Sequence, residues 1–137
     1  MNRTDLQKLS NTRIREAQIL FKAEEYSGAY YLAGYAVECA LKACVAKGVK
    51  RYDFPEKGLS DKVFTHDLAT LLKHSKSSAE LEAESKANPR FAACWDVVIK
   101  WSEGSRYTIW TRNQAEALLD AILRRKDDVM SWIKQRW

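Results

Sequence analysis

Glycine and proline are scarce in this sequence, at 5 and 2 of 137 residues. Turn-rich sheet proteins depend on such residues, whereas helices are weakened by them, so the shortage argues against a β fold and favours helices. A chain of this length can bury one substantial core but is short for two ordinary domains. We therefore expect one all-α domain that spans residues 1–137.

Cysteines and long apolar runs are also rare. The three cysteines, Cys39, Cys44 and Cys94, are odd in number and form neither a CxxC pair nor a cysteine–histidine cluster. We expect free thiols in the core rather than disulfides or zinc ligands. No segment reaches the roughly 18 uninterrupted apolar residues of a membrane span, and the chain starts with the polar stretch MNRTDLQKLS. These features predict a cytoplasmic protein that does not enter a membrane.

The familiar catalytic motifs are missing as well. The sequence contains no glycine-rich phosphate loop, no HExxH, no nucleophile elbow and no paired metal-ligand spacing. It therefore predicts neither a metal nor a cofactor. The remaining candidates for chemistry are Glu38 inside an apolar segment, the SRYT turn at residues 105–108, and the two histidines, His66 and His74.

Positive charge is in excess, because 23 Lys and Arg residues against 18 Asp and Glu give a net charge of +5. The basic residues gather within residues 47–62, 73–76, 124–126 and 134–136. If these places meet in space, they form a patch for an anionic partner. The alternative is an ordinary solvated surface.

Apolar residues repeat at helical spacing along most of the chain. The first helix is expected to open at Thr4, where TDLQ resembles a capping box. The second runs from about Tyr26 to Lys47 and ends at Gly48, a left-handed C-cap. This second helix is apolar on most sides, which places it at the centre of a bundle or in a subunit interface. Its Gly34 and several alanines would let another helix approach closely.

The second half of the chain is predicted to contain several short helices and one long helix. Residues 48–64 form a basic loop, either a binding loop or a surface excursion. Helices then start at Thr65 and Pro89, and the polar helix between them has a capping box that begins at Ser77. The last helix starts in the capping box TRNQ at Thr111 and continues for about 25 residues. The expected fold is an antiparallel bundle of four main helices plus a short additional helix.

Glu38 lies in the middle of the most hydrophobic segment, GAYYLAGYAVECALKACVAKG. A buried carboxylate is costly unless it is paired, so this residue needs a partner or a function. It could pair with Lys42 one turn later, or with Arg106 across the bundle. The alternative is direct contact with a ligand in a cleft.

Three segments together resemble a known family. They are YYLAGYAVECALKACVAK, FTHDLATLL and WSEGSRYT, with a tryptophan-bearing helix before the third and a long helix after it. The similarity is to the bacterial and archaeal branch of the HEPN domain superfamily, and it covers roughly residues 10–135. It implies an all-α bundle that commonly forms a homodimer with a cleft near the interface. It also implies one of three activities. These are metal-independent ribonuclease activity, binding of RNA or a nucleotide, and a toxin-like pairing with a small nucleotidyltransferase.

The resemblance also suggests catalytic residues. HEPN ribonucleases carry an Arg followed after about four to six residues by a His at the start of the last helix, often near a polar residue of the second helix. Arg106 matches the Arg and Glu38 matches the polar residue. The His does not match, because its positions hold Thr111, Arg112 and Asn113.

The missing imidazole matters for the chemistry. Metal-free RNA cleavage needs a base and an acid, whereas an Arg supplies only charge stabilisation. His66 could supply the imidazole if it reaches the cleft from the third helix. Otherwise His66 is a residue at the start of the third helix with no part in catalysis.

These observations predict a protein that binds an anionic partner, RNA or a nucleotide, at a cleft shaped by a Glu38–Arg106 pair. Tyr107, Trp110 and Arg112 are the further ligand-binding candidates. Trp110 could stack on a base or fill the core, and Arg112 adds positive charge at a helix N-terminus.

Two other functions stay open. The first is a ribonuclease toxin that uses Arg106 with a displaced base, either His66 or the Tyr107 hydroxyl. The second is a non-enzymatic interaction subunit, in which the apolar second helix builds an oligomer and no RNA or nucleotide is bound.

Overall fold

The computed structural model describes residues 1–49, 64–124 and 126–137, and all regular structure in these residues is helical. The α-helices are α1 (Arg3–Lys22), α2 (Tyr26–Lys47), α4 (Leu68–His74), α5 (Ser78–Ala87), α6 (Pro89–Ile99), α7 (Arg112–Leu123) and α8 (Val129–Lys134). The 3₁₀ helix η1 (Glu103–Tyr107) lies between α6 and α7. The predicted all-α bundle is confirmed. No helix in the described ranges is long and apolar enough to cross a bilayer.

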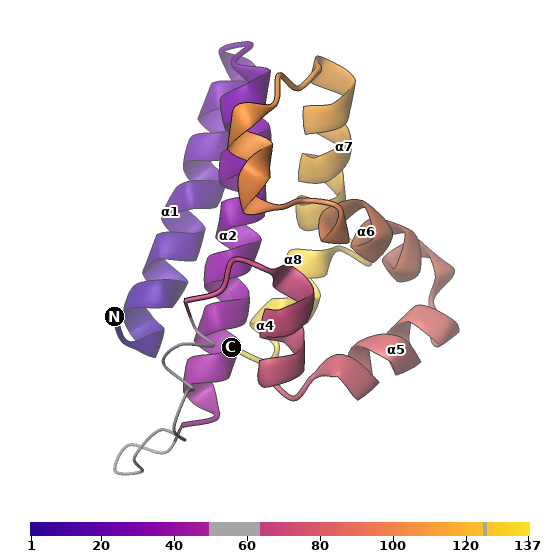
Figure 1. The fold of residues 1–137 in the computed structure, drawn as a ribbon. Coiled ribbons are helices and arrows are strands. Elements are labelled where there is room, and N and C mark those ends of the chain that lie inside the picture. Colours follow the sequence, from indigo (N-terminus) through magenta and orange to yellow (C-terminus); the bar gives the residue numbers. More distant parts are fainter. Residues whose placement is uncertain (50–63, 125) are drawn as a thin grey trace.

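α2 is the central element of the bundle. It lies side by side with the antiparallel α1, and η1, α4, α7 and α8 also contact it (Figure 1). α6 packs on α7, and α5 packs on α6 at the periphery. The two ends of the described chain lie close together, since the Arg3 guanidinium donates to the Trp137 main-chain oxygen at 2.6 Å.

The sequence of α2 explains this central place. Five of its alanines have no exposed surface, and its buried residues cover most of the circumference of the helix. Gly34 faces the indole ring of Trp101, which follows α6, and a Cβ at this position would overlap that ring. The close approach predicted at Gly34 is therefore made by a tryptophan side chain rather than by a second helix. Most of the apolar surface of α2 is covered by its own chain, while Tyr31, Leu32 and Tyr35 stay partly exposed.

Two helix starts differ from the prediction. α1 is capped by Asn2, whose side chain accepts from the Asp5 N–H while Asp5 accepts from the Asn2 N–H, so the helix does not open at Thr4. Asparagine is a favoured N-cap, and the acidic residue three positions later completes the capping box, whereas Thr4 lies inside the first turn. α4 is preceded by Asp67 rather than Thr65, whose hydroxyl instead accepts from the Asp67 N–H.

Two predicted caps are also wrong. Gly48 follows α2 with a φ of −72°, in the right-handed region, so it is not a left-handed C-cap. Ser77 stands at the N-cap of α5, but its side chain makes no capping bond to the helix and donates to the Ser75 carbonyl. The predicted basic loop at residues 48–64 lies mostly outside the described residues.

The long last helix is divided in two. α7 ends at Leu123, and α8 begins at Val129 after Asp127 with a φ of 67°. Asp128 is the N-cap of α8, because its side chain accepts from the Ser131 N–H at 3.0 Å. Aspartate is a favoured N-cap and competes with helix continuation, which explains the break. The interruption turns α8 back onto α2 and α6.

Candidate functional site

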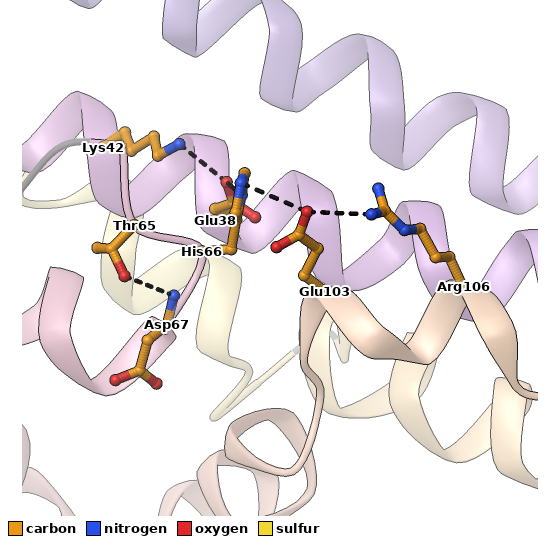
Figure 2. Close-up of polar contacts among 7 residues, drawn as sticks. All are labelled: Glu38, Lys42, Thr65, His66, Asp67, Glu103 and Arg106. Carbon is orange, nitrogen blue, oxygen red and sulfur yellow. Dashed lines mark hydrogen bonds and ion pairs between the residues drawn. The ribbon is translucent and has the colours of Figure 1, made fainter.

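Five side chains from three elements form a row of alternating charge (Figure 2). Lys42 and Glu38 come from α2, His66 from the segment before α4, and Glu103 and Arg106 from η1. Glu38 Oε1 lies 2.9 Å from Lys42 Nζ and 2.7 Å from His66 Nδ1. Glu103 Oε1 lies 3.5 Å from His66 Nε2 and 3.4 Å from Arg106 Nη2. We call these five residues the charged row.

Glu38 is the buried member of the charged row, with 1% of its side chain exposed. Residues 38 and 42 lie one turn apart on the same face of α2, so the predicted pair with Lys42 is formed. Oε1 forms an ion pair with Lys42 and a hydrogen bond with His66, while Oε2 has no hydrogen-bond partner among the described residues. The carboxylate in the apolar helix is thus stabilised by neighbours at its solvent-facing edge.

The expected direct pair between Glu38 and Arg106 is not formed. Arg106 is paired with Glu103 from the same 3₁₀ helix, and His66 and Glu103 lie between it and Glu38 (Figure 2). The two predicted residues therefore belong to one site but contact each other only through two intermediates.

His66 reaches the site from the segment that leads into α4. Leu68, two residues later, is buried in the core and fixes α4 against α2. The Thr65 hydroxyl accepts from the Asp67 N–H and holds the turn before the helix (Figure 2). The His66 side chain then points toward α2 with 43% of its surface exposed. His66 is therefore more than a helix-start residue, since it contacts a buried carboxylate.

The two ring nitrogens of His66 have different environments. Nδ1 lies at 2.7 Å from the Glu38 carboxylate, so the neutral ring places its proton on Nδ1 and donates it there. Nε2 then carries the lone pair and faces Glu103 and solvent. When the ring is protonated, Nε2 donates as well and attracts an anion. The arrangement can therefore hold an anion or accept a proton at the same atom.

Arg106 is the outer member of the charged row, with 44% of its side chain exposed. Its guanidinium lies 4.9 Å from the centroid of the Tyr107 ring, which is 79% exposed. The neighbouring Tyr107 side chain and then the negative charge of Glu103 raise the pKa of Arg106 above its ordinary value. Arg106 is therefore a permanent cation at the surface, beside an exposed aromatic ring.

Trp110 holds η1 against α2. Its ring stacks on Tyr30 with centroids 3.7 Å apart, and its indole N–H donates to the Ser105 carbonyl at 2.8 Å. Its main-chain N–H donates to the Ser27 hydroxyl at 2.9 Å. One ring face and the indole N–H are thus occupied by the chain itself. This geometry favours the packing role of Trp110 over base stacking.

Arg112, the other predicted ligand-binding cation, is exposed on the first turn of α7. Thr111 caps this helix as predicted, with its hydroxyl accepting from the Gln114 N–H and the Gln114 side chain accepting from the Thr111 N–H. Arg112 takes part in none of the ion pairs found in the described ranges. It is therefore placed at the surface without a structural partner of opposite charge there.

The cysteines take no part in the site. All three are free and buried, as predicted. Burial, followed by the nearby Glu38 charge, raises the pKa of Cys39 to about 11, and burial raises the pKa of Cys44 to about 11. Such thiols stay protonated near neutrality and are poor nucleophiles. Across the described ranges, no group of three His, Cys, Asp or Glu side chains is placed to hold a metal ion.

No family model, curated protein or solved structure matches this chain. The resemblance to the HEPN superfamily therefore stays a prediction from the sequence. The function has to be argued from the geometry of the charged row.

Glu103 is the member of the charged row that the sequence analysis missed. Its signal was the spacing of Glu103 and Arg106, three residues apart in a short polar segment, which is the spacing of a local ion pair. Its contact with His66 had no local signal, because it joins η1 to a segment far away in sequence.

Proposed function

We propose that the charged row binds a phosphate group of RNA or of a nucleotide. The observation that supports this most directly is the place of Glu103, whose Oε1 lies 3.5 Å from His66 Nε2 and 3.4 Å from Arg106 Nη2. The Arg106 guanidinium and, when its ring is protonated, the Nε2–H of His66 thus approach one anionic oxygen from separate elements. Carboxylate and phosphate oxygens accept from the same donors, which supports a phosphate oxygen in the place of Glu103 Oε1.

A phosphate can replace Glu103 at little cost. Both contacts of Glu103 Oε1 are long for charge-assisted hydrogen bonds, and the three side chains involved are 38–44% exposed. Exposed ion pairs of this kind contribute little to stability. A terminal phosphate of a nucleotide carries more charge than a carboxylate, and any phosphate group can match the planar guanidinium in a bidentate way, which favours the exchange. The exposed Tyr107 ring beside Arg106 offers a surface on which an adjacent base can stack.

A second candidate function, metal-independent RNA cleavage, is favoured by the contact of Glu38 with His66. The carboxylate accepts the Nδ1 proton and so orients the ring, as in other carboxylate–histidine pairs. Nε2 could then take the proton of a ribose 2′-hydroxyl while the 2′-oxygen attacks the phosphorus. The P–O5′ bond breaks, a 2′,3′-cyclic phosphate forms, and the leaving 5′-oxygen takes a proton from water. Arg106 would stabilise the charge that develops on the phosphate. In this function His66 is the displaced base and Glu38 is its positioning residue.

The first experiment is a titration of fluorescently labelled single-stranded RNA with the purified protein at low and physiological salt. Binding is followed by anisotropy, and the same samples are run on a gel. We expect salt-sensitive binding, because each phosphate contact releases counterions. We expect Arg106→Ala to weaken it about tenfold or more, as a charge-assisted bond is lost. The control is Arg90→Ala, which removes the same charge from the exposed surface of α6.

The gel separates the two candidate functions. Intact RNA with binding that depends on Arg106 supports phosphate binding alone. Cleaved RNA, lost in His66→Ala while binding remains, supports the ribonuclease. Equal binding by the Arg106→Ala and Arg90→Ala variants would overturn both, since the affinity would then come from net charge.

The partners implied by the HEPN resemblance, a second copy of the chain and a small nucleotidyltransferase, are proposals of the same kind. The interaction-subunit alternative rests on the apolar second helix as the oligomer-building element, and most of α2 packs against its own chain in the described ranges. Light scattering of the purified protein, alone and with the product of a neighbouring nucleotidyltransferase gene, tests these partners. A monomer in both cases would refute them.

A further inference from the structure

The His66 ring lies between two carboxylates that come from separate elements. Its Nδ1 lies 2.7 Å from Glu38 Oε1 on α2, and its Nε2 lies 3.5 Å from Glu103 Oε1 on η1. Since 43% of the side chain is exposed, water can bring protons to the ring. Histidine is also the one residue type in the charged row that ordinarily changes its charge near neutral pH.

The charged groups around the ring balance one another. Those that face it from α2 and η1 in the described ranges are Glu38, Lys42, Glu103 and Arg106. On its own segment, the Asp67 carboxylate accepts from the Thr70 hydroxyl and points away from the ring (Figure 2). Two cations and two carboxylates cancel, so the net charge of the charged row is zero with a neutral ring and +1 with a protonated ring.

A neutral ring leaves one of the two contacts unfavourable. Its proton lies on Nδ1, where the Glu38 carboxylate accepts it, so Nε2 presents a lone pair to the Glu103 carboxylate. Two acceptors that face each other form no hydrogen bond. In this state the ring offers no donor to an incoming phosphate, which meets the carboxylate and the Arg106 guanidinium instead.

We propose that protonation of His66 strengthens phosphate binding at the charged row, so that the site binds RNA more tightly as the pH falls; this regulation rests on the function proposed above. The protonated ring adds the Nε2–H as a second donor beside Arg106 and gives the charged row its net positive charge. It attracts Glu103 as well, but a bound phosphate places a second anion near the ring while the displaced carboxylate stays within the reach of its side chain. The complex therefore gains more from the protonated ring than the free protein does.

The test compares RNA binding at about pH 5.5, where an ordinary histidine is mostly protonated, with binding at about pH 8, where it is mostly neutral. The probe is 2′-O-methyl oligouridylate with a label of constant charge. Its phosphodiesters and uracil bases do not titrate between these pH values, and it cannot be cleaved by attack of a 2′-hydroxyl. We expect about three- to tenfold tighter binding at the lower pH in low salt, and a smaller difference at physiological salt.

The chain contains two histidines, which supplies a matched pair of variants. His66→Asn keeps an amide that can donate to Glu38 but cannot be protonated, so it should abolish the pH effect. His74→Asn changes the last residue of α4, outside the charged row, and should leave the pH effect unchanged. Both are measured beside the Arg106→Ala and Arg90→Ala variants at each pH.

A second measurement needs no variant of His66. If protonation strengthens RNA binding, bound RNA must strengthen protonation by the same factor. The ring signals of the two histidines are followed by proton NMR through the neutral pH range and assigned with His74→Asn. We expect the oligonucleotide to move the titration midpoint of His66 to higher pH and to leave that of His74 in place.

The results distinguish a failure of the pH effect from a failure of phosphate binding. Equal binding by Arg106→Ala and Arg90→Ala at both pH values overturns both proposals. Binding that depends on Arg106 but is equal at the two pH values, with an unshifted His66 signal, overturns the pH effect alone. A pH effect that persists in His66→Asn overturns it as well, because another group would then be responsible.

Discussion

Replacing Gly34 by alanine is expected to destabilise the protein, although alanine is the better helix former. In an open helical position the substitution would stabilise α2 by about 1 kcal/mol. At Gly34 the new Cβ overlaps the indole ring of Trp101, which is 3% exposed and has no free space to move into. Overpacking of this kind typically costs about 1–3 kcal/mol and more where a ring must shift. We expect a net loss of about 2 kcal/mol.

The control lies in the same helix. A Cβ on Gly28 would meet only the Leu20 Cδ1 at 3.1 Å, the end of a flexible and partly exposed side chain. Gly28→Ala should therefore be neutral or stabilising by up to about 1 kcal/mol. The same Gly→Ala change is therefore expected to leave unchanged or raise the free energy of unfolding at position 28 and to lower it at position 34.

Thermal and urea unfolding of the three proteins measure this difference. A loss of 2 kcal/mol lowers the melting temperature by about 6 °C in a domain of this size. Because Trp101 is followed directly by η1, Gly34→Ala should also weaken RNA binding at Arg106. The argument is refuted if Gly34→Ala is as stable as the unchanged protein, or if Gly28→Ala is destabilised equally.

Three further predictions follow from the site and the core. Glu103→Gln removes the carboxylate that competes with a phosphate and should tighten RNA binding several-fold. The control is Glu82→Gln, which removes the same charge from α5, and equal effects of the two variants would mean that only net charge matters. Trp110→Ala removes the ring that holds η1 and should cost about 2–3 kcal/mol in urea unfolding and weaken RNA binding, whereas Trp110→Phe should cost less; equal costs would contradict the stacking role. Because burial raises the pKa of both Cys39 and Cys44 to about 11 from an ordinary value of 9.0, the unfolded chain loses these protons first. Stability should therefore fall as the pH rises from about 9 toward 11, and a Cys39→Ala, Cys44→Ala double variant should flatten this slope in urea titrations; an unchanged slope would refute the assignment.

Local sequence signals predicted α2 well and the end of the chain poorly. The run of apolar and small residues placed α2 at Tyr26–Lys47, as observed. The break between α7 and α8 was missed because apolar residues continue at helical spacing on both sides of it. Its signal was present in two successive aspartates, Asp127 and Asp128, of which one adopts the left-handed conformation and the other caps α8.

The candidate site shows the same limit. The Glu38–Lys42 pair follows from helical spacing and could be predicted from the sequence alone. The contact of His66 with Glu38 could not, because it depends on how α4 docks on α2 through buried leucines. The predicted direct pair of Arg106 with Glu38 is wrong, because η1 places Glu103 between Arg106 and His66. Spacing predicts contacts within an element, whereas contacts between elements depend on packing.

One face of α2 carries the residues that hold η1 and one end of the charged row. Ser27 and Tyr30 hold Trp110, Gly34 receives the indole that leads into η1, and Glu38 and Lys42 form one end of the charged row. These residues follow one another at intervals of three and four, so they share one line along the helix. The insertion of a single residue between Gly34 and Glu38 would rotate the anchors by about 100° relative to the carboxylate and separate η1 from His66. Conversely, a designed helix that repeats these intervals would present the anchors of η1 and the carboxylate along one line, as residues 27–42 do.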